Sequence, residues 1–87
     1  MMRIVYKYPL VFVHEQDILL PDDIEPLSVQ VQNGTICLWG LTSPGRPELR
    51  KVWIIGTGHA EVPERARHIG TVQIHDFVWH IFIEPVH

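Results

Sequence analysis

The segment Gly56-Thr57-Gly58-His59 comes closest in this sequence to a device of known chemistry, a glycine-rich loop that binds phosphate. Two glycines beside a histidine leave backbone N–H groups accessible and can form a small anion-binding nest. The dinucleotide-binding fingerprint needs a third glycine where Glu61 stands, and a Walker loop needs a Gly-Lys-Ser/Thr sequence that does not occur. The segment therefore favours a bend that releases the chain from a sheet, with binding of a small anion as the second interpretation.

Histidines are frequent, and the six of them are His14, His59, His68, His75, His80 and His87. Zinc sites use ligands at short fixed spacings such as Cys-x-x-Cys or His-x-x-x-His, and neither spacing occurs here. His75 and His80 share one expected hairpin, but their side chains would need tertiary help to meet. We therefore expect no metal site and histidines that are solvated or hydrogen-bonded.

No arrangement of residues predicts covalent catalysis. A Gly-x-Ser-x-Gly nucleophile elbow does not occur, and no histidine is followed two residues later by Thr or Ser, as in phosphoesterases with two such motifs. Cys37 is expected in the middle of a strand, opposite Gln30, as a small half-buried packing residue. The sequence favours a binding protein with no catalytic residues and no cofactor, and a small histidine-dependent hydrolase is an alternative.

Length, charge and cysteine content narrow the class of protein. Eighty-seven residues form one β-rich domain over residues 1–87. Ten acidic residues against seven basic ones give a formal charge of −3, which disfavours binding to a nucleic-acid polymer. The single cysteine fits a reducing compartment, and Lys7 and Pro9 interrupt the start before it resembles a signal peptide or membrane span. We expect a soluble, cytoplasmic protein that binds no membrane.

Asn33-Gly34 is the clearest local signal, because both residues accept the positive φ of a type I′ turn. The flanking segments are rich in residues typical of β-strands. Folding the chain at this turn pairs Gln32 with Thr35 and continues to Ser28 with Trp39, and paired residues share a face. One face is then Val29, Val31, Ile36 and Leu38, and the other is Ser28, Gln30, Gln32, Thr35, Cys37 and Trp39.

Other apolar runs predict further strands, which we expect over residues 3–8, 10–13, 18–20, 50–57, 69–74 and 77–83. The last two form a hairpin around His75-Asp76, and apolar residues on both faces of the 50–57 segment predict a central strand. Seven prolines disfavour long helices, so at most one short helical turn is expected near 63–68. The sequence predicts an all-β fold, a small antiparallel meander that forms a sandwich or a partly open barrel.

The polar face of the first hairpin offers a place for a ligand. Trp39 is an aromatic plate beside Gln30, and a ring with neighbouring amides suits a small planar ligand such as a nucleobase. Arg50 supplies positive charge for a phosphate. The predicted ligand-binding set is Trp39, Gln30, Thr57, Gly58, His59 and Arg50. The alternative interpretation is an ordinary solvent-facing sheet.

Four segments of the chain form a recognisable order. They are Tyr6-Lys7-Tyr8 near the N-terminus, residues 24–41 (IEPLSVQVQNGTICLWGL), residues 52–59 with their Gly-Thr-Gly-His, and residues 69–82 (IGTVQIHDFVWHIF). In this order the segments resemble a family of small phage and prophage proteins of unknown function. The resemblance covers nearly the whole chain and implies a shared fold. It also implies a setting in which a short acidic phage protein interferes with host machinery, by blocking a host enzyme or by sequestering a nucleotide immune signal.

The sequence as a whole predicts a phage-encoded, non-enzymatic binding protein that acts in the host cytoplasm. It would sequester a nucleotide-like or other small anionic ligand and so antagonise host defence. Three tryptophans, Trp39, Trp53 and Trp79, are many for so small a core and predict a homo-oligomer. The alternative functions are a protein–protein inhibitor of a host factor and the hydrolase mentioned above.

Overall fold

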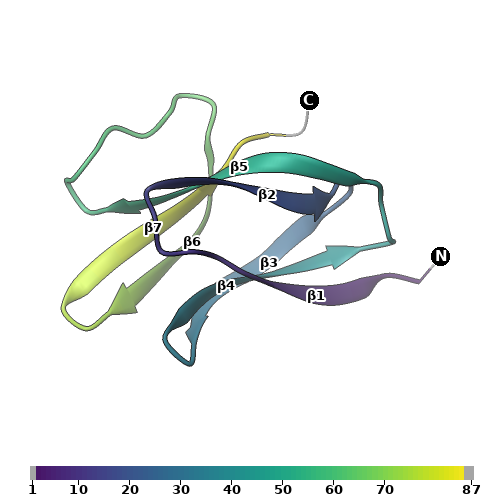
Figure 1. Cartoon of the computed structure of the whole chain (residues 1–87), viewed down its shortest axis with the longest axis horizontal. Helices are drawn as coiled ribbons and strands as arrows, with labels where there is room; N and C mark the ends of the chain where they lie inside the picture. Colours follow the sequence, from purple (N-terminus) through teal and green to yellow (C-terminus); the bar gives the residue numbers. More distant parts are fainter. Residues whose placement is uncertain (1, 86–87) are drawn as a thin grey trace.

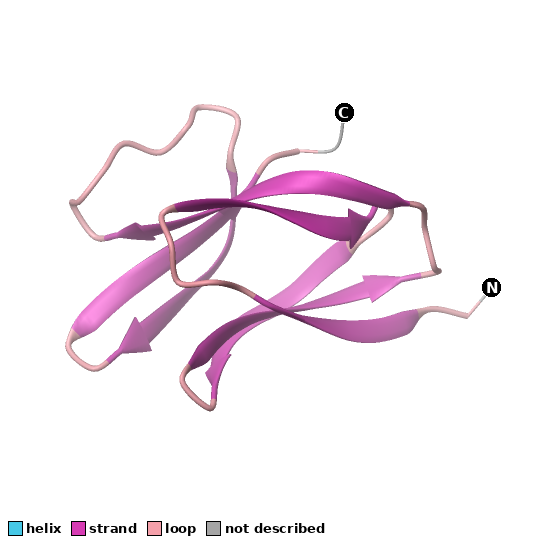
Figure 2. Cartoon of the chain, in the orientation of Figure 1, coloured by secondary structure: helices cyan, strands magenta, loops and turns pink. Residues whose placement is uncertain are grey.

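Seven strands make up the regular structure of the chain (Figure 1). The computed structural model describes residues 2–85. The strands are β1 (Ile4–Pro9), β2 (Glu15–Pro21), β3 (Glu25–Gln32), β4 (Thr35–Thr42), β5 (Pro47–Gly56), β6 (Arg67–Ile74) and β7 (Phe77–Ile83). Strands and loops account for all of residues 2–85 (Figure 2), and this part of the chain holds no helix that could span a membrane. The predicted all-β class is confirmed.

The strands form two antiparallel sheets. One has three strands in the order β1-β4-β3, and the other has four in the order β2-β5-β7-β6. Neighbours in the sheets are often distant in sequence, because β1 pairs with β4 and β2 pairs with β5. The predicted small sandwich is therefore confirmed, with long-range strand pairs in addition to the hairpins of a meander.

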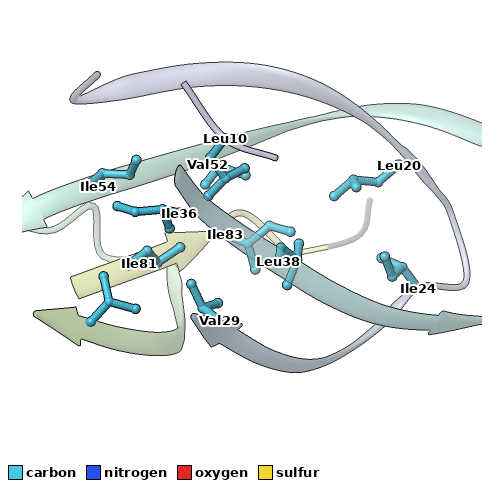
Figure 3. Packing of buried hydrophobic residues seen from close by; sticks show 11 residues of the cluster. Leu10, Leu20, Ile24, Val29, Ile36, Leu38, Val52, Ile54, Ile81 and Ile83 are labelled. Atoms are coloured by element: carbon cyan, nitrogen blue, oxygen red, sulfur yellow. The ribbon is translucent and has the colours of Figure 1, made fainter. Parts of the chain in front are cut away.

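The core lies between the two sheets, whose inner side chains point toward one another (Figure 3). Leu38 comes from the three-stranded sheet, and Leu20 and Ile81 come from the four-stranded sheet; all three are fully buried. Residues 52–55 of β5 are buried on both faces. This confirms the prediction of a central strand, since β5 lies between β2 and β7.

The hairpin of β3 and β4 has the register that its sequence predicts. Gln32 pairs with Thr35, and the pairing continues to Ser28 with Trp39. The turn residues Asn33-Gly34 have φ angles of 50° and 78°, the left-handed values that a type I′ turn requires.

Burial on this hairpin follows the two predicted faces, with one difference on each. Val29, Ile36 and Leu38 are buried, whereas Val31 is exposed near the turn. On the other face Cys37 is fully buried instead of half-buried. Cys37 is more buried than expected because β4 is the central strand of its sheet, with β1 and β3 on either side.

The hairpin of β6 and β7 also has the expected register. Ile74 pairs with Phe77, and Val72 pairs with Trp79. His75 has a φ of 54°, so the turn uses the left-handed region at a residue that tolerates it better than most. The predicted turn at His75-Asp76 is confirmed.

The expected strand over residues 10–13 is not formed. The N–H of Leu10 donates to the carbonyl of Ile36 (2.8 Å). Both backbone groups of Val11 then bond to the side-chain amide of Gln16, at 3.0 and 2.7 Å, and not to a neighbouring strand. Because a side chain satisfies this backbone, the segment is a loop, and β2 begins after it.

The charged segment between β5 and β6 contains a turn and no helix. The N–H of Ala66 donates to the carbonyl of Pro63 (2.9 Å), which closes the turn. Strand β6 begins immediately afterwards at Arg67, two residues earlier than the sequence suggested.

Two aspartates between β2 and β3 fasten their loop to the loop between β4 and β5. The carboxylate of Asp23 accepts hydrogen bonds from the hydroxyl of Thr42 and from the N–H and hydroxyl of Ser43 (2.8 and 2.7 Å). Asp22 accepts one from the N–H of Arg46 (3.0 Å). These donors hold the pKa of Asp23 at about 2, below its ordinary 3.8. This aspartate clamp holds the start of β3 in place.

Candidate functional site

A pocket of about 420 Å³ opens between the two sheets, where β6 begins and β7 ends. Its volume lies in the range of small-molecule sites. Half of its lining residues are aliphatic or proline, and its charged groups are two arginines and a glutamate. We call it the arginine pocket, and its lining residues are Ile24, Glu25, Pro26, Arg50, Arg67, His68, Ile69 and Ile83.

Two β-bulges shape this end of the sandwich. The register of β3 shifts between Pro26 and Ser28, and that of β6 shifts between His68 and Gly70. A bulge bends its strand and redirects the side chains beside it. Past the bulges the two edge strands touch, since a Cβ at Gly70 would lie 2.6 Å from the Cβ of Val29. The sheets therefore meet at Gly70 and leave space at the bulges, where the pocket lies.

Arg50 is the most unusual residue of the arginine pocket, because its side chain is charged and only 5% of the residue is exposed. Its Nη2 donates to the carbonyl oxygen of Glu84 (2.5 Å), whereas its Nε is buried without a hydrogen-bond partner in residues 2–85. Burial lowers the pKa of the guanidinium; Glu48 and Glu84 oppose this effect and Arg67 adds to it. A buried donor without an acceptor is rare and destabilising.

Positive charge is left unpaired in the arginine pocket. The carboxylate of Glu25 pairs with Arg3 at 3.3 Å. The other ion pairs of residues 2–85 join Lys51 to two carboxylates of β2, so none includes Arg50 or Arg67. An anion in the pocket would reduce the repulsion between the two arginines.

Four side chains on the outer face of the four-stranded sheet form a continuous hydrogen-bonded chain. Thr57 Oγ1 lies 2.8 Å from His80 Nε2, and His80 Nδ1 lies 3.1 Å from Thr71 Oγ1. Thr71 Oγ1 in turn lies 2.8 Å from His68 Nε2. The pairing of Thr71 with His80 places them on one face, and His68 also lines the arginine pocket. We call these four residues the histidine–threonine chain.

The contact between Thr57 and His80 has the spacing of a nucleophile and its base. In hydrolytic triads the second ring nitrogen of the histidine meets a carboxylate, which stabilises the imidazolium. Here that nitrogen meets the uncharged hydroxyl of Thr71. These four side chains therefore differ from a hydrolytic triad in having a hydroxyl where the triad has a carboxylate.

Toward the other end of β7, three rings pack around Trp79. The ring of Phe12 lies 4.8 Å from it, that of His59 lies 6.0 Å away and that of Phe77 lies 6.4 Å away, between centroids. Gly56 allows His59 to approach, because a Cβ there would lie 2.2 Å from the Nδ1 atom. We call Phe12, His59, Phe77 and Trp79 the aromatic cluster. All of them but Phe77 border a pocket of about 300 Å³ that no Asp, Glu, Lys or Arg lines.

Two residues of the predicted ligand-binding set lie on the three-stranded sheet. Trp39 and Gln30 share its outer face, where the amide of Gln30 donates to the hydroxyl of Ser28 (3.0 Å). The structure brings these two together as the sequence predicts. It does not bring them to Arg50, which faces the space between the sheets.

The other residues of the set lie near the end of β5. Thr57 belongs to the histidine–threonine chain, and His59 belongs to the aromatic cluster. Gly58 lies between them with a φ of 75°, in the left-handed region that favours glycine. The six predicted residues thus occupy three places, and Arg50 is the one that lines the arginine pocket.

Sequence reasoning missed Arg67 and His68 as partners of Arg50. A bulge decides where their side chains point, and a bulge is not visible in an alternating pattern. The available signal was Gly70, because an isolated glycine inside a strand marks a bulge or a close backbone approach. Within residues 2–85 no three His, Cys, Asp or Glu side chains gather to hold a metal, and His87 lies outside the described residues.

Comparisons with known proteins place the chain by family alone. No curated protein and no solved structure matches it. A family model described as Domain of unknown function (DUF7352) matches residues 1–87. This match agrees with the expectation of an uncharacterised family, and because it spans the whole chain, the protein is a member of the DUF7352 family.

Proposed function

We propose that the protein is a non-enzymatic binding protein whose ligand is a small anion held in the arginine pocket. The observation that carries this proposal is Arg50, a buried guanidinium whose Nε has no partner. Leaving a buried donor unsatisfied costs about 1–3 kcal/mol, and an anionic acceptor forms a stronger hydrogen bond than a neutral one. Burial of this charge beside Arg67 is unfavourable, and an anion in the pocket would offset the unfavourable charge.

The shape and lining of the pocket narrow the ligand. Arg67 supplies a second positive charge, and Glu25 is already paired with Arg3. The remaining lining residues are three isoleucines, a proline and His68, which is the one aromatic residue among them. These lining residues suit a ligand that has an anionic group joined to a small aliphatic group. A nucleotide-like ligand, expected from the sequence, would place its phosphate here and its base outside the pocket.

The test is a thermal-shift and calorimetric panel of inorganic phosphate, sulfate, acetate and linear and cyclic nucleotides. A ligand at ten times its Kd stabilises the folded state by about 1.4 kcal/mol. For a domain of this size that raises Tm by about 6–11 °C. Arg50→Met and Arg67→Gln should lose the shift. Arg65→Gln removes the same charge from an exposed turn and should keep it.

Two results would contradict the proposal. One is a panel in which no anion changes the Tm of the wild-type protein. The other is a shift of equal size in Arg50→Met, Arg67→Gln and the Arg65→Gln control, because this would trace the effect to general charge screening.

The biological role stays a prediction. The resemblance to phage and prophage proteins supports a role in the host cytoplasm, where sequestering a small anionic signal would antagonise host defence. Membership of a family of unknown function is compatible with this role and does not test it.

A second candidate function is self-association through the aromatic cluster, and one observation favours it. Val11 and Phe12, in the loop before β2, are 65% and 57% exposed, and Phe77 is 59% exposed. An uncharged apolar patch lets two copies of a chain with net charge −3 approach without local repulsion. Sedimentation at about 100 μM should show a dimer that Phe12→Ser dissociates and Leu49→Ser, at another exposed site, does not. A monomeric wild type would exclude this function.

A further inference from the structure

The sandwich is closed along one side and open along the other. On the closed side the edge strands β3 and β6 are in contact, and Gly70 lies against Val29. On the open side no comparable contact joins the edge strands β1 and β2. A pocket of about 330 Å³ lies there, between Tyr6 and Tyr8 of β1 and Leu19 of β2, and its lining residues in the described part of the chain carry no charge. One edge of β1 therefore has no neighbouring strand in that part of the chain.

The pairing of β1 with β4 decides which backbone groups face this open edge. In an antiparallel pair, directly opposite residues alternate between exchanging both backbone hydrogen bonds and exchanging none. The N–H of Leu10 donates to the carbonyl of Ile36 (2.8 Å), and this pair continues the register of β1 with β4. The even-numbered residues of β1 therefore bond to β4. The N–H and C=O groups of Val5 and Lys7 point to the open edge instead.

The turn at Asn33-Gly34 leads to the same assignment from the other side of β4. In a two-residue hairpin the residues that flank the turn, here Gln32 and Thr35, exchange both backbone bonds, so the odd-numbered residues of β4 bond to β3. The even-numbered residues of β4 are left for β1, as the bond between Leu10 and Ile36 requires.

The charged side chains beside this edge turn away from it. A lysine or a proline often protects an edge strand from pairing with another chain. Here Lys7 Nζ donates to the side-chain oxygen of Gln32 (2.8 Å), and Arg3 pairs with the carboxylate of Glu25 (3.3 Å). Both acceptors belong to β3, on the far side of β4. Pro9 lies at the end of β1, so it blocks only that end of the edge.

Strand β2, at the other open edge, has the opposite character. The N–H of Ile54 donates to the carbonyl of His14 (3.0 Å), which continues the register of β2 with β5, so the odd-numbered residues of β2 direct their backbone groups to its open edge. Two of these are Glu15 and Asp17, and Lys51 pairs with both, which leaves one negative charge in excess. Two copies of β2 paired about Asp17 would place like charges directly opposite each other, which is destabilising.

We propose that two copies of the chain associate by antiparallel pairing of β1 with β1, about a two-fold axis at Tyr6. In this register Val5 of each copy exchanges both backbone hydrogen bonds with Lys7 of the other. Tyr6 faces Tyr6 of the second copy as a cross-strand aromatic pair, and Ile4 faces Tyr8. No like charges lie directly opposite each other, and the two three-stranded sheets become one continuous sheet.

The exposed side chains of β1 support a second copy as the partner. Ile4, Val5 and Tyr6 are apolar or aromatic and exposed, and pairing partly covers them. This surface is separate from the aromatic cluster and from the arginine pocket. Anion binding, or its failure, therefore has no bearing on it.

Hydrogen exchange of the wild-type protein tests the register directly. The small interface predicts a weak dimer, so sedimentation should show an increase in mass with chain concentration. At about ten times Kd about a fifth of the chains are monomeric, and the amides of Val5 and Lys7 should exchange about fivefold more slowly than in dilute solution. The amide of Tyr6 bonds to β4 and should be protected at every concentration. The amide of Asp17 faces the edge of β2 and should exchange rapidly at every concentration.

Two pairs of matched variants test the interface. Val5→Pro removes an N–H from the open edge of β1 and should abolish the dimer, and the fold tolerates it because this N–H makes no bond to β4. Asp17→Pro makes the same change at the edge of β2 and should keep the dimer. Tyr6→Lys places two positive charges opposite each other at the two-fold axis and should also abolish the dimer. Leu49→Lys adds the same charge at an exposed site on the other sheet and should keep it.

The outcomes separate this interface from the alternatives. A dimer that persists in Val5→Pro or in Tyr6→Lys overturns the proposal, and so does a dimer that Phe12→Ser alone dissociates. A wild type that stays monomeric also overturns it and leaves the edge of β1 to a strand of another protein. If both proline variants unfold, exchange in the wild type decides: amides of Val5 and Lys7 that do not respond to concentration overturn the proposal, and a selective slowing at these two positions supports it.

Discussion

The arginine pocket and the aromatic cluster lie toward opposite ends of β7, and they satisfy their side chains in different ways. In the aromatic cluster the rings of Phe12, His59 and Phe77 are within reach of Trp79, so these side chains pack against one another. In the arginine pocket the Nε of Arg50 has no acceptor among residues 2–85, so this buried group stays unsatisfied there. The comparison leads us to expect that the aromatic cluster contributes more to stability than the arginine pocket does.

The sharpest test of this difference is Trp79→Ala, for which we expect the largest loss of stability. The substitution removes a half-buried ring that packs against the core and three other rings. It should lower the free energy of unfolding by about 3 kcal/mol. The matched control is Trp39→Ala on the outer face of the other sheet, which should cost about 1 kcal/mol. Equal losses in urea unfolding would show that the aromatic cluster has no special share of the stability.

Gly70→Ala should have the next largest effect, because it acts where the sheets meet beside the arginine pocket. The new Cβ would lie 2.6 Å from the Cβ of Val29 and must push β3 and β6 apart. Overpacking of this kind costs about 2 kcal/mol. In a double-mutant cycle, Gly70→Ala combined with Val29→Gly, which removes the Cβ at position 29, should lose less stability than the sum of the single variants. Strict additivity would contradict the proposed contact.

Arg50→Met should change stability least among the buried positions, by less than about 1 kcal/mol and in either direction. Replacing a buried unpaired charge by an apolar side chain of similar length removes a desolvation penalty along with one hydrogen bond. Urea unfolding without ligand measures this effect. A loss as large as that of Trp79→Ala would show that Arg50 is a structural residue and would remove the contrast between the two ends.

The sequence predicted the two hairpins but not the arginine pocket. Both hairpins were predicted to the residue pair, because a two-residue turn and alternating side chains fix a register locally. The arginine pocket was not predicted. It depends on bulges at Leu27 and Ile69 and on the meeting of β3 with β6, which are distant in sequence. Arg50 was selected for its charge alone, and its burial beside Arg67 follows only from the assembled sheets.

The loop over residues 10–14 shows the same limit on a smaller scale. Its apolar run predicted a strand, but the amide of Gln16 bonds to both backbone groups of Val11. The strand pattern was present without a neighbouring strand to pair with. Local patterns therefore predicted elements and turns, and they failed where a side chain or a distant strand decides the backbone partner.

Asp23→Asn should have the smallest effect, and it tests whether the arginine end depends on its aspartate clamp. The folded-state pKa of Asp23 is about 2, lowered from 3.8 chiefly by the hydroxyl of Thr42 and then by Ser43. A carboxylate whose pKa falls on folding stabilises the protein above its unfolded pKa and loses that contribution as the pH drops through the folded value. The wild type should therefore be more stable than Asp23→Asn at pH 6, and the difference should shrink between about pH 4 and 2.

Urea unfolding at several pH values measures this difference, with Asp76→Asn in the turn between β6 and β7 as the control that should show little change. The clamp holds the start of β3, where Ile24 and Glu25 line the arginine pocket. Asp23→Asn should accordingly weaken sulfate binding more than it weakens the packing of Trp79. The fluorescence of Trp79, in a variant that lacks the other two tryptophans, would report that packing. A constant stability difference from pH 6 to pH 2 would mean that the carboxylate charge of Asp23 contributes nothing to this end of the sandwich.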